Sequence, residues 1–197
     1  MAGFGFHELF KKNRLYHEIG NKFYPFGFSR PMIRFVSDNY KHDITGVEIG
    51  VQRGYHSLNM FTVLGDRLQK LYLIDPWAKD NELDKEHDWF NTLPVAKKVL
   101  NRYKDRVVYC KGFSQDEKII SNIPDDSVDF VYIDGNHDYE TTKQDIFNFL
   151  PKVKLGGVLG GHDMTVGAPG VIQAVQEFID ETGYTLQGSA FDWWVII

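Results

Sequence analysis

The chain has 197 residues and a mass of 22.8 kDa, the size of one domain with a complete α/β core. Its net charge of -5 and its lack of clustered Lys and Arg argue against a nucleic-acid scaffold, because phosphate contacts need such clusters. The single cysteine, Cys110, cannot close an internal disulfide, and no stretch approaches the roughly 20 apolar residues of a membrane span. We expect a cytoplasmic protein with no nucleic-acid or membrane partner.

The first 44 residues are rich in aromatic side chains and contain turn signals at 25–27 and at Arg30-Pro31. We expect residues 1–44 to form an N-terminal cap and residues 45–197 to form the main domain. Two interpretations of the cap stay open. It covers the sheet edge, or it faces a substrate or a second subunit in a homodimer.

Apolar runs alternate with helical patterns through the rest of the chain, which predicts parallel βαβ units. The predicted strands are 45–50, 71–75, 107–110, 128–134, 157–161, 184–187 and 192–197. The predicted helices are 57–68, 89–103, 114–120, 141–150 and 171–181. A Gly188-Ser189 turn joins the last two strands as a hairpin. The pattern predicts a doubly wound seven-stranded α/β sheet that ends in an antiparallel hairpin.

The first strand leads into a glycine-containing turn, with Glu48, Gly50 and Gly54 in the spacing Glu-x-Gly-x-x-x-Gly. This turn is looser than the Gly-x-Gly-x-x-Gly of dinucleotide sites, and it lacks the Lys-Ser/Thr of a P-loop. It suits adenosine with a small zwitterionic tail, which describes S-adenosylmethionine. Ser57 and the first helix N–H groups are predicted to hold the ligand carboxylate, and Glu48 its ammonium. A buried structural Glu48 is the alternative.

Two further strand ends carry candidate cofactor contacts, because ligands of open parallel sheets lie beyond the carboxyl ends of the strands. Asp75 closes the second strand, and its carboxylate is predicted to accept hydrogen bonds from both ribose hydroxyls; a helix N-cap is the alternative. Residues 112–116 follow the third strand and are predicted to read adenine. The candidates there, together with the apolar face of Pro76, are Gly112, Phe113, Ser114 and Gln115. Ser114 is also a candidate N-cap.

The fourth and fifth strands end in Asp134, His137, His162 and Asp163, which we expect to face one cavity. Carboxylates and an imidazole are ligands for a divalent cation, with oxygen ligands favouring Mg²⁺ or Ca²⁺ and the imidazole tolerating Mn²⁺, Fe²⁺ or Zn²⁺. Alternatively His137 or His162 is a general base. A histidine that merely bonds a neighbouring loop is the third interpretation.

The region from Val47 to the C-terminus resembles the class I S-adenosylmethionine-dependent methyltransferases, which have a Rossmann-like sheet of seven strands with a reversed last strand. Within them it is similar to the small O-methyltransferases related to the catechol, caffeoyl-CoA and macrocin enzymes. Residues 112–116 resemble the Gly-Ala-Ser-Gln-Asp loop of the catechol group. Residues 133–139 and 156–163 resemble the Asp-x-x-His-x-Tyr and Gly-Gly-x-x-x-x-His-Asp patterns of the macrocin-like group.

The resemblance implies S-adenosylmethionine as cofactor, with Asp134, His162 and Asp163 at the positions that hold Mg²⁺ in the metal-dependent enzymes. Asp134 and His137 become the catalytic candidates, with His137 at the position of the lysine base in the catechol group. The sequence departs from the pattern twice, because His162 replaces a carboxylate and His137 replaces the lysine.

The predicted reaction is transfer of a methyl group from S-adenosylmethionine to an oxygen of a small molecule, with positioning as the main catalytic effect. A base at His137, or a metal, makes the acceptor oxygen nucleophilic. The aromatic N-terminal segment and the 76–91 loop, with Trp77 and Trp89, would exclude water. The alternatives are a catalytically inactive subunit or a non-methylating cofactor-binding relative.

Overall fold

The structure is a computed structural model that describes residues 29–77 and 92–197. Residues 1–28 of the predicted cap, most of the predicted 76–91 loop, and the predicted helix start at Trp89 lie outside the described residues. Within the described ranges, no helix is both long and apolar enough to cross a bilayer.

Seven strands form one sheet in the order β3-β2-β1-β4-β5-β7-β6. The strands are β1 (Ile44–Ile49), β2 (Leu68–Asp75), β3 (Val107–Lys111), β4 (Val128–Ile133), β5 (Val153–Gly161), β6 (Gln187–Ser189) and β7 (Asp192–Ile196). Strands β1 to β5 pair in parallel, whereas β7 is antiparallel to both β5 and β6. The predicted doubly wound sheet with its C-terminal antiparallel hairpin is confirmed. Its strand order reverses between β1 and β4, which is where such sheets bind ligands.

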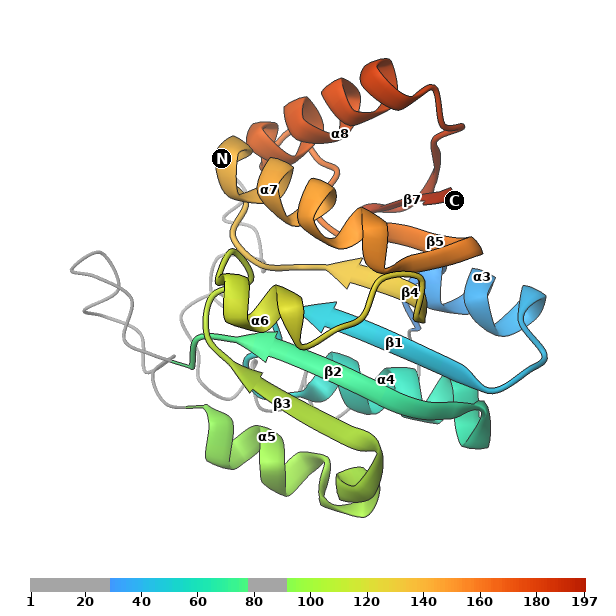
Figure 1. The fold of residues 1–197 in the computed structure, drawn as a ribbon, viewed down its shortest axis with the longest axis vertical. Coiled ribbons are helices and arrows are strands. Elements are labelled where there is room, and N and C mark those ends of the chain that lie inside the picture. The colour runs from blue at the N-terminus through green and yellow to red at the C-terminus, as the bar shows by residue number, and fades with distance from the viewer. Residues whose placement is uncertain (1–28, 78–91) are drawn as a thin grey trace, which may run out of the picture.

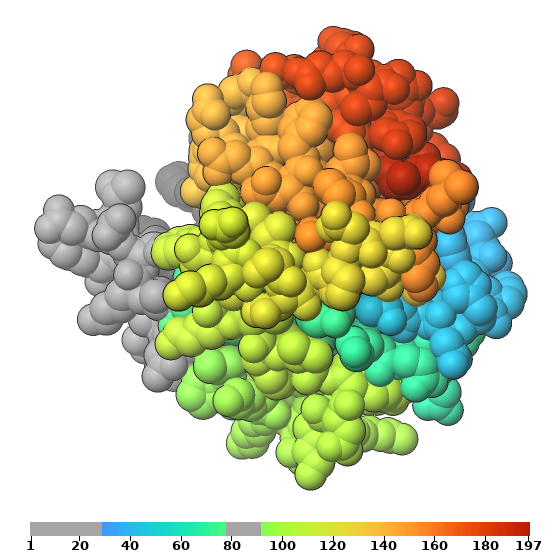
Figure 2. Space-filling model, in the orientation of Figure 1, coloured from blue at the N-terminus to red at the C-terminus, as the bar shows by residue number. Residues whose placement is uncertain are grey.

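Helices cover both faces of the sheet (Figure 1). They are α3 (Pro31–Asn39), α4 (Tyr55–Leu64), α5 (Leu93–Val99), α6 (Glu117–Ser121), α7 (Tyr139–Phe149) and α8 (Pro169–Thr182), with short 3-10 helices η1 (Gly65–Arg67), η3 (Asn101–Arg106) and η4 (Leu150–Lys152). Buried side chains of α3 and α4 form one core with the sheet, and those of α6, α7 and α8 form a second. Figure 2 shows the face that α6, α7 and α8 cover.

The central strands are buried on both sides because both helical layers pack on them. Every residue of β4 is buried, and five of the six residues of β1 are. A continuous apolar run of this kind is typical of a parallel strand inside an α/β sheet. These two strands therefore give the carboxyl edge of the sheet a rigid base.

Several element boundaries differ from the predictions. The sixth strand, predicted at 184–187, is Gln187–Ser189, and the described part of the helix predicted at 89–103 is α5, which ends at Val99 and is followed by η3. The helix predicted at 57–68 ends at Leu64, because Gly65 has φ 62 and Leu68 already begins β2. The helix predicted at 114–120 is the shorter α6, whose N-cap is Asp116, so Ser114 does not cap it. The predicted Gly188-Ser189 turn is wrong, since both residues lie in β6 and the turn is at 190–191.

Candidate active site

The turn between β1 and α4 packs directly on the end of β4. Gly50 has φ +84, and a Cβ atom there would lie 1.9 Å from the carbonyl oxygen of Asp134. Gly54 has φ +75 and is the N-cap of α4. Glycine at both positions permits this left-handed backbone and the close approach to β4. The two predicted glycines thus shape the edge where the strand order reverses.

Asp75 holds this turn in place from the end of β2. Its Oδ2 accepts hydrogen bonds from the backbone N–H groups of Val51 at 2.9 Å and Gln52 at 2.8 Å. Its Oδ1 accepts one from Trp77 N at 2.7 Å. The carboxylate is almost fully buried, and it ties the turn after β1 to the end of β2. Its predicted contact with a ribose stays a prediction, as does that of Pro76, which follows it.

Glu48 lies under the same turn, fully buried, with its oxygens facing the first turn of α4. His56 Nδ1 lies 2.9 Å from Glu48 Oε1, and the Ser57 hydroxyl donates a hydrogen bond to Glu48 Oε2. Burial raises the pKa of Glu48 to about 8, and it holds the pKa of His56 well below its ordinary value. Burial therefore favours the neutral form of both hydrogen-bonded groups.

These contacts bear on the predicted roles of Glu48 and Ser57. Both side chains are fully buried and bonded to one another, as in the alternative of a structural Glu48. Their contacts with a cofactor's ammonium and carboxylate stay predictions. His56 was not singled out from the sequence, although its place eight residues after Glu48, in the first turn of a helix, is the signal that could have found it.

The loop of residues 112–116 follows β3 and lies beside α7. Phe113 is about half exposed at 51%, which leaves an apolar ring face at the surface. Gln115 Nε2 donates to Ser114 Oγ at 2.8 Å and to Asp145 Oδ1 at 2.7 Å. Gly112 begins the loop, and its N–H bonds to the carbonyl of Asp75 at 3.1 Å. The loop is thus tied to the end of β2 through Gly112 and to α7 through Gln115.

Asp145 on α7 was missed by the sequence analysis. Its side chain is fully buried, and burial raises its pKa to about 7. Among the described residues, its Oδ2 has no hydrogen-bond partner. A buried acceptor beside Gln115 adds hydrogen-bonding capacity to the predicted adenine loop. Nothing in the local sequence of an amphipathic helix distinguishes this carboxylate from a solvated one.

The ends of β4 and β5 bring the four predicted polar residues together. Asp163 Oδ2 lies 2.9 Å from His137 Nε2 and 3.0 Å from His162 Nδ1. His162 Nδ1 lies 3.8 Å from Asp134 Oδ1. The hydrogen bonds of the two imidazoles hold the pKa of Asp163 well below its ordinary value. The bond to Asp163 raises the pKa of His137, and burial raises that of Asp134.

Arg30 completes this cluster from the N-terminal side, and the sequence analysis had assigned it only to a turn. Its Nη1 lies 2.8 Å from Asp134 Oδ2 and donates to the Tyr132 hydroxyl at 2.9 Å. Tyr132 in turn donates to Asp192 Oδ1 at 2.8 Å. The only sequence signal is the position of Arg30 immediately before Pro31, which starts α3.

The predicted metal ligands are near one another, but the two carboxylates among them already have nitrogen partners from this chain. Asp134, His162 and Asp163 each offer one ligand atom within 4.8 Å of the others. However, Asp134 is already paired with Arg30, and both imidazoles bond the same oxygen of Asp163. Arg30 bonds Oδ2 of Asp134, so a divalent cation would have to bind Oδ1, on the side of His162, against the repulsion of the guanidinium charge.

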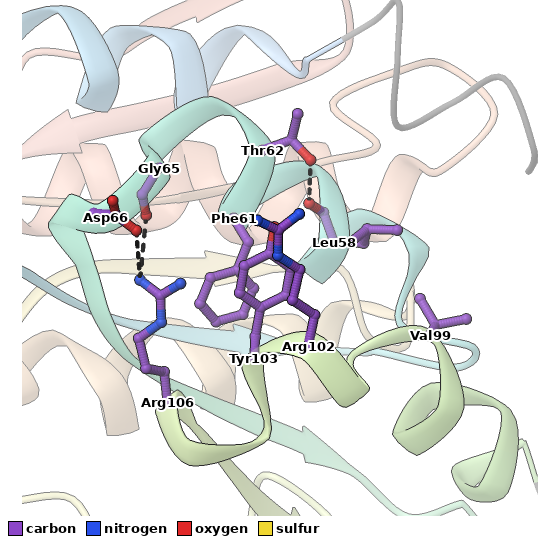
Figure 3. A pocket seen from close by; sticks show the side chains of 9 residues that line it. All are labelled: Leu58, Phe61, Thr62, Gly65, Asp66, Val99, Arg102, Tyr103 and Arg106. Atoms are coloured by element: carbon purple, nitrogen blue, oxygen red, sulfur yellow. Dashed lines mark hydrogen bonds and ion pairs between the residues drawn. The ribbon is translucent and has the colours of Figure 1, made fainter.

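A surface cavity lies elsewhere, at the amino ends of β2 and β3 (Figure 3). Its lining comes from α4, η1, α5 and η3, where the rings of Phe61 and Tyr103 stack at 4.3 Å and Arg106 points to Gly65 and Asp66. None of the predicted site residues lines it. The candidate active site is therefore at the opposite end of the strands.

The strand order, the glycine turn after β1 and the acid at the end of β2 define a Rossmann-like fold of the methyltransferase type. A family model described as a methyltransferase domain matches residues 47–164, and the chain belongs to this family. The matched region contains every site residue predicted from the sequence, whereas Arg30 lies outside it.

Solved structures show the same fold. The chain is similar to the O-methyltransferase NovP, with 18% identity, a TM-score of 0.61, and coverage of 84% of this chain and 77% of that chain. It is similar to the calicheamicin methyltransferase CalS11, with 14% identity, a TM-score of 0.65, and coverage of 99% and 86%. An O-methyltransferase from Bacillus cereus in complex with SAH has 16% identity, a TM-score of 0.60, and coverage of 91% and 81%.

A curated relative is the uncharacterized protein y4gI of Sinorhizobium fredii (strain NBRC 101917 / NGR234). It is 27% identical over 123 residues, which cover 61% of this chain. The match spans only 13% of the length of that relative.

Proposed function

We propose that this protein transfers a methyl group from S-adenosylmethionine to a hydroxyl oxygen of a small molecule. The observation that carries the proposal is the family match over 47–164, which includes the turn after β1, Asp75, the 112–116 loop and the cluster at the ends of β4 and β5. The structural neighbours named as O-methyltransferases support oxygen as the acceptor atom.

The cofactor would lie across the carboxyl ends of β1, β2 and β3. Asp75 and the turn that it holds would face the ribose and the amino-acid part, and Phe113 and Gln115 would face the adenine. The N–H groups at the start of α4 favour a carboxylate there, because a helix N-terminus carries partial positive charge. These residues would bind and orient the sulfonium methyl.

His137 is the proposed general base. Its Nε2 is bonded to Asp163, which fixes the ring and leaves Nδ1 to take the proton of the acceptor hydroxyl. When bound, S-adenosylmethionine would supply the methyl group: its carbon–sulfur bond would break as the acceptor oxygen bonds to the methyl carbon, leaving a methyl ether and S-adenosylhomocysteine. His137 would take the proton that the hydroxyl loses. The side chain of His137 is 51% exposed, so that an acceptor can reach it.

A calorimetric titration with S-adenosylmethionine and S-adenosylhomocysteine tests the cofactor. We expect saturable binding of both with a stoichiometry of one. Absence of binding to either would remove the methyltransferase proposal and favour a non-methylating relative. Turnover would be measured as transfer of a radioactive methyl group to a panel of phenols and sugars. Cofactor binding without such transfer would favour the catalytically inactive relative.

The remaining expectations from the sequence are part of this proposal. The partner is a small-molecule acceptor, and the N-terminal segment is a candidate dimer surface. Sedimentation of the purified protein over a range of concentrations would measure the oligomeric state directly.

A further inference from the structure

The ion pair between Arg30 and Asp134 places a guanidinium inside the cluster of candidate metal ligands. The Asp134 side chain is only 17% exposed, and so is that of Arg30. A buried carboxylate needs a partner charge or several hydrogen-bond donors. Arg30 supplies the partner charge and one hydrogen bond, from Nη1 to Asp134 Oδ2 at 2.8 Å.

Arg30 is held in this position by a chain of contacts that runs through β4 and β7 to the backbone of α3. Its Nη1 also donates to the Tyr132 hydroxyl at 2.9 Å, and its guanidinium carbon lies 5.4 Å from the centre of the Tyr132 ring. Tyr132 is fixed by Asp192, whose Oδ2 accepts from the backbone N–H of Met32 at 3.0 Å. The guanidinium is therefore positioned by β4, β7 and α3 together.

The other carboxylate of the cluster, that of Asp163, also has hydrogen-bond donors from this chain. Asp163 Oδ2 accepts from His137 and His162. Each carboxylate that could ligate a metal thus already has a nitrogen donor of this chain within 3.0 Å. A metal would have to compete with these donors and would be repelled by the fixed charge of Arg30.

We propose that Arg30 is the resident cation of this site: it bonds Asp134 Oδ2, its fixed charge repels a divalent metal from the neighbouring Oδ1, and it positions Asp134 for a metal-independent reaction. That the site takes a methyl acceptor rests on the proposed function. The pairing of Arg30 with Asp134 does not depend on it. Arg30 acts through Asp134 and is a positioning residue.

Mn²⁺ titration, followed by the paramagnetic resonance signal of the free ion, tests this proposal without an acceptor. We expect weak binding to the wild-type protein and an affinity about tenfold or more higher in Arg30→Met, because the repelling charge is gone. Arg34→Met is the matched control: Arg34 lies on α3, is exposed, and bonds to Ser29. We expect the control to bind Mn²⁺ as the wild type does.

Two further variants separate the charge from the shape of the side chain. Arg30→Lys keeps the charge and should keep Mn²⁺ binding weak. Arg30→Met combined with Asp134→Asn should lose the affinity gained, because the ligand is removed. If Arg30→Met does not fold by circular dichroism, Arg30→Gln repeats the test with a neutral side chain that still donates to Tyr132.

An Mn²⁺ affinity that is the same with and without Arg30, whether tight or weak, overturns the proposal. A parallel titration with S-adenosylhomocysteine in EDTA keeps the two proposals distinguishable. Failure of that ligand to bind would overturn the proposed function, while the Mn²⁺ results would still decide the role of Arg30. Binding that needs Mg²⁺ would count against a metal-independent site.

Discussion

Glu48 shows how a single buried carboxyl can make the stability of the whole protein depend on pH. Its pKa is raised to about 8 from an ordinary value of 4.5, mainly by burial. Between these values the folded state binds more protons than the unfolded state, so stability falls as pH rises through this window. The contribution of His56 to the pH dependence of stability has the opposite sign, because its pKa is lowered below 6.5. This contribution stops changing above that pH.

We therefore predict that the Glu48→Gln variant loses part of the pH dependence of stability. Between pH 6.5 and 8 the wild-type free energy of unfolding should fall by up to about 2 kcal/mol relative to the variant. Urea denaturation of both proteins across this range measures the difference. The shared contribution of Asp145 cancels in the comparison. Parallel pH profiles would show that Glu48 is already ionised in the folded protein.

Asp75 gives a second prediction at this scale. Its carboxylate accepts three backbone hydrogen bonds, and the amide of asparagine would replace one of the two accepting oxygens with an NH2 donor. In Asp75→Asn we expect the affinity for S-adenosylhomocysteine to fall by about tenfold or more, with about 1–3 kcal/mol of lost stability. Calorimetry measures the affinity, and Asp66→Asn, at a fully exposed side chain, is the control. Unchanged affinity would remove Asp75 from the cofactor site.

The sequence predicts the strand-end residues well and their partners poorly. Asp134, His137, His162 and Asp163 follow strands whose apolar runs are visible, and parallel strands bring their carboxyl ends together. Arg30 lies 104 residues from Asp134 along the chain, and only the packing of α3 brings the two together. His56 and Asp145 are also found only through packing, since a helical periodicity does not reveal which polar side chains are buried.

At the scale of elements, the turn between β1 and α4 depends on the room that a glycine leaves. Gly50 and Gly156 both have a left-handed backbone, with φ +84 and +81. A Cβ at Gly50 would overlap the Asp134 carbonyl, whereas nothing lies within 4 Å of one at Gly156. Substituting alanine at Gly156 therefore tests backbone strain alone, whereas the same substitution at Gly50 tests strain and steric crowding together.

We predict that Gly156→Ala costs about 1 kcal/mol of stability, the cost of a left-handed backbone with a side chain. Gly50→Ala should cost about 2 kcal/mol more and should weaken binding of S-adenosylhomocysteine, because the turn must shift away from β4. Thermal unfolding and calorimetry of both variants measure the two effects. Equal losses would mean that the turn relaxes without cost.

The errors in the predicted elements have physical causes. Gly188-Ser189 has the composition of a turn, but Asp192 must reach Met32 and Tyr132, and this sets the register of the hairpin so that the turn falls at 190–191. The helix after β3 is short because its loop first returns toward α7 through Gln115. Such demands come from tertiary contacts, which local composition does not encode.

At the scale of the whole molecule, the doubly wound class of sheet could be predicted, because alternating strands and helices favour few topologies. The sequence did not predict that the last strand would help to build the site. Asp192 begins β7, is almost fully buried, and bonds both α3 and β4. It thereby joins the C-terminal strand to the helix that follows Arg30.

This connection predicts that Asp192→Ala affects both stability and the site. The change leaves the Met32 N–H and the Tyr132 hydroxyl without their acceptor, at about 1–3 kcal/mol for each buried group. We expect the urea midpoint to fall with an unchanged slope, since the cooperative unit stays the whole sheet. Asp192→Asn, which keeps one acceptor oxygen, should lie between this variant and the wild type. Asp105→Ala, at an exposed side chain of η3, should match the wild type.

Because Tyr132 also holds Arg30, Asp192→Ala should tighten Mn²⁺ binding in the direction expected for Arg30→Met. Lost stability with unchanged Mn²⁺ affinity would show that Asp134 alone holds Arg30.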